Sequence, residues 1–158
     1  MATRSCQKKF GGPGPCRNLD TPKAESRIPS GSSPSEELKE FEDEYAGRTR
    51  QEYQADRKLQ KLIDRTVENI LTALIEICGT FLAERGGAAD SYAEVLQACA
   101  GQLGFQQREQ EQLAALAMIR NRLAHRYLNF RWQAVEDFSK KRTLVAGLVS
   151  EILEKIDH

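Results

Sequence analysis

The sequence predicts an all-α protein, an antiparallel bundle of about five helices. Pro34 is the last proline in the chain, so everything up to residue 158 lacks the residue that most strongly interrupts a helix. Over the same stretch apolar residues recur at intervals of three and four, which is the spacing of one helical face. The connections between the predicted helices are short, and short connections favour antiparallel neighbours.

The first two predicted helices each begin at a capping box. Residues 33–36 (SPSE) place Ser at the N-cap, Pro at the first helical position and Glu at the third, which predicts a short helix that ends at Gly47. Residues 49–52 (TRQE) form a second box and open the longest helix, which the run RGG at 85–87 ends. Its core stripe is predicted to consist of Leu59, Ile63, Val67, Ile70, Leu74, Ile77 and Phe81.

Three further helices complete the predicted bundle. Residues 91–94 (SYAE) are a third capping box and start a helix that ends near Gly104. A fourth helix is expected from about Gln107 through the segment 120–127, and a last one from about Trp132 to Ile156.

The chain is predicted to divide into a disordered basic tail, residues 1–34, and a helical domain, residues 35–158. The tail contains all five prolines and an excess of four positive charges, so the remainder of this neutral chain carries four negative ones. Without apolar periodicity the tail cannot bury enough surface to offset its ordering entropy. Its two cysteines, Cys6 and Cys16, match no usual zinc spacing, so no metal is expected there.

No part of the sequence predicts an association with a membrane. The tail lacks the apolar core of a secretory signal peptide, and no later segment approaches about 18 uninterrupted apolar residues. We therefore expect a cytoplasmic protein.

The segment 120–127 (RNRLAHRY) places side chains used in phosphate chemistry on what is expected to be two helical turns. The guanidinium group of Arg120 can bind two phosphate oxygens in a fixed geometry. Histidine, the residue at position 125, is the side chain that can take and give a proton near neutral pH. The segment thus predicts a candidate site for cutting RNA. The plainer interpretation is a solvated basic face with a histidine near a helix C-terminus.

The predicted helix around this segment has two apolar faces. Leu113, Leu116, Ile119 and Leu123 form the stripe expected to face the bundle. The opposite stripe is also small, apolar or uncharged, and consists of Ala114, Met118, Asn121 and His125. We interpret this outer stripe as a homodimer interface, because two-fold symmetry would bring both copies of His125 and Asn121 together with Arg120 at the flank.

The pattern Arg-Asn-x-Leu-Ala-His-x-Tyr in the fourth of five helices resembles the signature of HepT-like toxins in the HEPN superfamily, and the resemblance extends over about residues 36–157. It implies a HEPN-like fold and a metal-independent endoribonuclease, without any cofactor, whose RNA site forms across a homodimer. It also implies regulation by a nucleotidyltransferase antitoxin of the MntA type. By this resemblance Arg120 and His125 are the catalytic pair, Asn121 supports them, and Tyr127 accepts AMP from the antitoxin.

A second function stays open at this point. The same helix could serve a non-catalytic helical module that binds a nucleotidyltransferase or presents its substrate. Arg120 and His125 would then be interface residues, and their replacement would weaken binding without any nuclease activity to lose.

Overall fold

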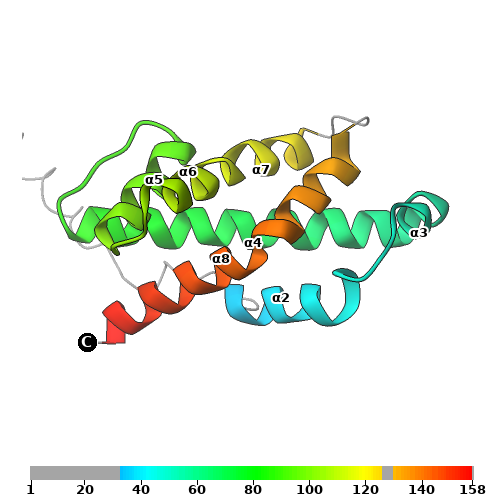
Figure 1. Ribbon diagram of the computed structural model, residues 1–158, viewed down its shortest axis with the longest axis horizontal. Helices are drawn as coiled ribbons and strands as arrows, with labels where there is room; N and C mark the ends of the chain where they lie inside the picture. The colour runs from blue at the N-terminus through cyan, green and yellow to red at the C-terminus, as the bar shows by residue number, and fades with distance from the viewer. Residues whose placement is uncertain (1–32, 126–129, 158) are drawn as a thin grey trace, which may run out of the picture.

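The computed structural model describes residues 33–125 and 130–157, and this part of the chain is helical and contains no strand (Figure 1). The predicted all-α fold is therefore confirmed. The elements in order are α2 (Pro34–Glu40), a π-helical turn η3 (Phe41–Tyr45), α3 (Arg50–Ala55), α4 (Arg57–Glu84), α5 (Tyr92–Gln102), α6 (Gln107–Ala114), α7 (Leu116–Ala124) and α8 (Arg131–Asp157). Of the predicted tail, only Ser33 and Pro34 lie within the described residues, where they form the predicted capping box of α2.

The helix α4 is the centre of the bundle, and the other helices except α6 pack closely against it. Figure 1 shows it crossing the width of the molecule, with α7 along one side, α2 along the other, and α8 crossing it obliquely from the side of α7 to the side of α2. Five positions of its predicted core stripe are buried, whereas Leu59 and Ile77 are half-buried. By length and composition alone α4 could cross a membrane, but core helices of soluble proteins often have the same length and composition. In this fold 44% of the most apolar 18-residue stretch of α4 is buried inside the bundle.

The long helix begins at Arg57, so its predicted start at the second capping box was wrong. That box is present, with the Thr49 hydroxyl accepting from the Glu52 amide, but it opens only the six-residue α3. Asp56 then adopts an extended backbone, and its Oδ1 accepts from the amides of Lys58 at 2.9 Å and Leu59 at 3.2 Å. An aspartate side chain competes in this way for helical N–H groups, so a new helix starts here.

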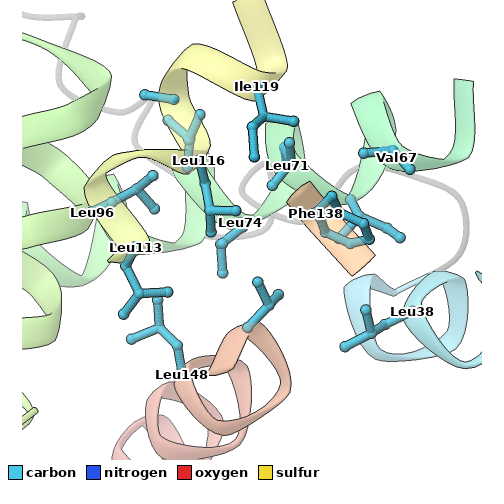
Figure 2. Close-up of a cluster of buried hydrophobic side chains, with 14 of the residues drawn as sticks. Leu38, Val67, Leu71, Leu74, Leu96, Leu113, Leu116, Ile119, Phe138 and Leu148 are labelled. Atoms are coloured by element: carbon cyan, nitrogen blue, oxygen red, sulfur yellow. The ribbon is translucent and has the colours of Figure 1, made fainter. Parts of the chain in front are cut away.

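The predicted fourth helix is in fact two helices, separated at Ala115. The Met118 amide donates to the Ala115 carbonyl at 3.2 Å. This bond spans three residues, as in a 3₁₀ turn, whereas the bonds of a continuing α-helix span four. The break lets α6 pack along α5 while α7 packs along α4. Leu113 and Leu116, one on each side of the break, are both fully buried as a result (Figure 2). Alanine favours helices, so the local sequence carried no signal of this break.

The remaining boundaries agree with the predictions to within a few residues. The Ser91 hydroxyl caps α5 through the Glu94 amide, although the Glu94 carboxylate takes the Asp90 amide and not that of Ser91. The turns after α4 and α5 contain Gly86 at φ 75° and Gly104 at φ 87°, a backbone conformation that glycine adopts without strain.

The core fixes the orientation of α7. Leu113, Leu116, Ile119 and Leu123 are buried, as predicted, and Figure 2 shows Leu116 and Ile119 directed toward Leu71 and Leu74 of α4. Phe138 of α8 packs edge-on against Phe41 of η3, with ring centroids 5.0 Å apart. Since one face of α7 is held in this core, its opposite face points away from the bundle.

Candidate functional site

The predicted outer stripe lies on the surface of the single chain. Met118 is 59% exposed, Asn121 and His125 are also exposed, and Ala114 is half-buried. Met118, Asn121 and His125 are therefore accessible on the surface of the single chain.

Three residues of the stripe border an open groove, which we call the interface groove. It has a volume of about 660 Å³ and lies between the start of α5 and the junction of α6 with α7. Ala114, Met118 and Asn121 line one side, and Tyr92, which is 48% exposed, lies on the other. His125 is one turn beyond Asn121, and its backbone amide donates to the Asn121 carbonyl at 3.0 Å. His125 thus follows the groove residues along the chain but does not itself line the groove.

The Arg120 side chain is held between two other helices. Its Nε donates to the Thr72 hydroxyl of α4 at 3.5 Å, and its guanidinium carbon is 5.5 Å from the ring centroid of Tyr92. A guanidinium group fixed on both sides loses less freedom when it binds an anion. Thr72 and Tyr92 were not predicted to belong to the site, because nothing in the local sequence indicates that these helices meet there.

His125 ends α7 and is not inside it. The helix finishes at Ala124, and His125 follows with φ −91° and ψ 3°. The expectation that one helix carries the whole segment 120–127 was therefore wrong. Arg122, two positions after Arg120, points elsewhere, with its guanidinium carbon 5.7 Å from the ring centroid of Phe130. Of these two arginines, only Arg120 contacts a residue that lines the interface groove, namely Tyr92.

Some predicted residues lie outside the part of the chain that the structure describes. Tyr127, the expected AMP acceptor, falls in the segment 126–129, and Cys6 and Cys16 fall in residues 1–32. Among the residues that are described, no three His, Cys, Asp or Glu side chains gather in a way that could hold a metal ion.

A buried polar cluster around Asp64 was not predicted from the sequence. Asp64 of α4 accepts from the Tyr53 hydroxyl and, at 3.1 Å, from Nη1 of Arg131 at the start of α8. Burial raises the pKa of Asp64 above its ordinary value, even though the hydrogen bonds from Tyr53 and Arg131 lower it. The cluster ties the start of α8 to α4.

The described residues form an all-α bundle of the HEPN-like type. A family model described as ribonuclease HepT-like matches residues 35–146, which is more than half of the chain and includes α7. The chain belongs to this HepT-like family. No curated protein and no solved structure matches it.

Proposed function

We propose that this protein is a metal-independent endoribonuclease toxin that cuts RNA at a site shared by two copies of the chain. The observations that carry the proposal are an Arg120 guanidinium that contacts Thr72 and Tyr92 and an exposed His125 that directly follows α7. The two residues are five positions apart in the sequence, so both lie near the end of this helix. The family of the chain, ribonuclease HepT-like, supports RNA as the substrate.

The interface groove supports the homodimer. A second copy related by a two-fold axis would cover Met118 and Tyr92, the large exposed side chains of the groove. The same axis would bring the Asn121 and His125 residues of both copies toward each other, with an Arg120 on each flank. One chain offers a single imidazole, whereas the dimer offers two in one cleft.

Two imidazoles divide the proton transfers of RNA cleavage between them. One His125 takes the proton of the ribose 2′-hydroxyl, and the 2′-oxygen then forms a bond to phosphorus. The other His125, as imidazolium, gives its proton to the 5′-oxygen as the bond from phosphorus to that oxygen breaks. Arg120 donates two N–H groups to the non-bridging oxygens, which carry the extra charge of the phosphorane. The products are a 2′,3′-cyclic phosphate and a 5′-hydroxyl.

The direct test is cleavage of RNA by the purified protein in the presence of a metal chelator. We expect fragments with 2′,3′-cyclic phosphate and 5′-hydroxyl ends, and no cleavage of a DNA oligonucleotide of the same sequence, because DNA lacks the attacking hydroxyl. Cleavage that appears only after divalent metal is added, or that leaves 5′-phosphate ends, would contradict the mechanism. Binding of a nucleotidyltransferase without any cleavage of RNA would favour the non-catalytic module instead.

We further propose that a nucleotidyltransferase antitoxin of the MntA type silences the site by adding AMP to Tyr127. Tyr127 is two positions after His125 in the sequence. The adduct would add a negative phosphate and a bulky adenosine close to the imidazole, where both would oppose an incoming RNA backbone.

This modification is expected to depend on one hydroxyl group. Incubation with the nucleotidyltransferase and ATP should add the mass of AMP to the wild type and to Tyr92→Phe, but not to Tyr127→Phe, as intact-mass spectrometry would show. Tyr92 is the matched control because it is an exposed tyrosine near the same helix. An unchanged AMP increment on Tyr127→Phe would place the acceptor elsewhere.

A further inference from the structure

A second depression in the surface lies where the first half of α4 meets the end of α7 and the start of α8. It has a volume of about 510 Å³, and we call it the basic groove. Arg57, Lys61 and Arg65 of α4 line it, together with Arg131 of α8 and Leu123 of α7. Nothing in the mechanism proposed above uses these four cations.

Three of the cations form one row with no acidic partner. Arg57, Lys61 and Arg65 are spaced by four residues, so they lie along one face of α4 with a rise of about 6 Å from each to the next. All three are exposed, and within the described residues none makes an ion pair at 4.0 Å or less, whereas Lys39, Arg48 and Arg142 do. Arg131 differs from the row, because Asp64 compensates its charge.

The row is an exception on an acidic body. Residues 35–158 carry 17 Lys and Arg against 21 Asp and Glu, a net charge of −4. The groove contains four cations against two acidic residues, Asp64 and Glu68. A local concentration of uncompensated positive charge on such a surface points to an anionic ligand.

The basic groove lies in line with α7, beyond its C-terminal end. Arg120 of α7 contacts Thr72 of α4, and Leu123 lies beside the groove residues that precede Thr72, so α7 runs antiparallel to α4. Going along α7 toward His125 therefore means going along α4 toward Arg65. Arg65 and Thr72 are seven residues apart, about 10 Å along the axis, which places the row just beyond the end of α7 that carries His125.

We propose that the basic groove binds the phosphodiester backbone of single-stranded RNA next to the linkage that is cut. A row of cations that follows a backbone is the usual way in which proteins hold single strands without reading their sequence. Arg57, Lys61 and Arg65 contact phosphates outside the cleavage step, so they are positioning residues. The inference rests on the proposed function and adds to it the path of the substrate on each copy.

The test is the salt dependence of RNA binding by the triple variant Arg57→Ala, Lys61→Ala, Arg65→Ala. The probe is a 2′-O-methyl oligoribonucleotide about 20 nucleotides long, which has no free 2′-hydroxyl and so stays intact. Binding weakens as salt rises, and for single strands each phosphate contact makes the slope of log K against log salt more negative by about 0.7. The triple variant loses three contacts, so we expect its slope to be less negative by about 2. The control triple variant Arg108→Ala, Lys140→Ala, Lys155→Ala removes the same charge from exposed positions outside the groove and should keep nearly the wild-type slope.

A cleavage assay separates positioning from catalysis. On a long RNA the groove variant should show a higher KM, whereas on a diribonucleotide, which is too short to reach the groove, its kcat should match that of the wild type. Equal losses on both substrates, or equal slopes in the groove and control variants, would overturn the proposal. The basic groove would then be a binding site for an acidic protein surface instead of RNA. If the wild type cuts RNA and only the groove prediction fails, the proposed function stands; if the wild type neither binds nor cuts RNA, both fail.

Discussion

Replacing His125 with alanine is expected to lower the rate of RNA cleavage by more than the about 10²- to 10⁴-fold that one positioned general acid or base usually contributes. Both proton transfers depend on this side chain in the proposed mechanism, so the dimer should lose both at once. The measurement is the single-turnover rate on an RNA oligonucleotide, with circular dichroism to verify that the helical content is kept. A variant that cleaves at the wild-type rate would remove His125 from the mechanism.

Arg120→Lys gives the companion result for the other half of the pair. Lysine keeps the charge but loses the forked donors and the fixed position between Thr72 and Tyr92, so we expect a loss of about 10²-fold in kcat. Arg122→Lys is the matched control, because Arg122 lies on the same helix and faces Phe130 instead of Tyr92. Equal activity of both lysine variants would show that the geometry of Arg120 is not needed.

Met118→Glu is expected to convert the dimer to monomers and to abolish most cleavage. Two-fold symmetry would place two such carboxylates close to each other inside an apolar interface, where their desolvation and mutual repulsion oppose association. Without the partner each chain keeps one imidazole and one guanidinium, and loss of a preorganised charged group typically costs about 10²- to 10³-fold in rate. Light scattering after size-exclusion chromatography gives the mass, and the RNA assay gives the rate.

Leu153→Glu is the control for this change. Leu153 is 44% exposed on α8 and does not line the interface groove, so the variant should remain dimeric and active. A Met118→Glu protein that is still dimeric and active, or a wild type that is active as a monomer, would contradict the shared site.

The starts of helices and the core could be predicted from the sequence because both depend on local chemistry. The boxes at residues 33–36 and 49–52 satisfy amide groups within four residues of themselves, and the buried stripe of α7 follows from helical periodicity. The break at Ala115 could not be predicted in this way. It depends on α6 packing mainly against α5 while α7 packs mainly against α4 and α8, a difference that no local window contains.

The surroundings of the proposed catalytic residues also could not be predicted from the sequence. Thr72 is 48 positions from the arginine that it contacts, and Arg131 is 67 positions from Asp64. Such pairs depend on how whole helices are placed, and neither member has an unusual local pattern. Asp64 stood one position after the predicted core residue Ile63, and an acidic residue at the edge of a core stripe was the one signal available.

The anchoring of α8 by the buried Asp64 has a consequence for the lifetime of inhibition. Leu123 near the end of α7 is buried in the core, and Arg131 at the start of α8 is held by Asp64, so both helices that flank Tyr127 in the sequence are anchored in the bundle. An AMP group attached covalently to Tyr127 would stay on the same chain as His125 and could not diffuse away. Silencing would then be independent of dilution, and it would persist after the modifying enzyme had dissociated, until the bond to AMP was cut.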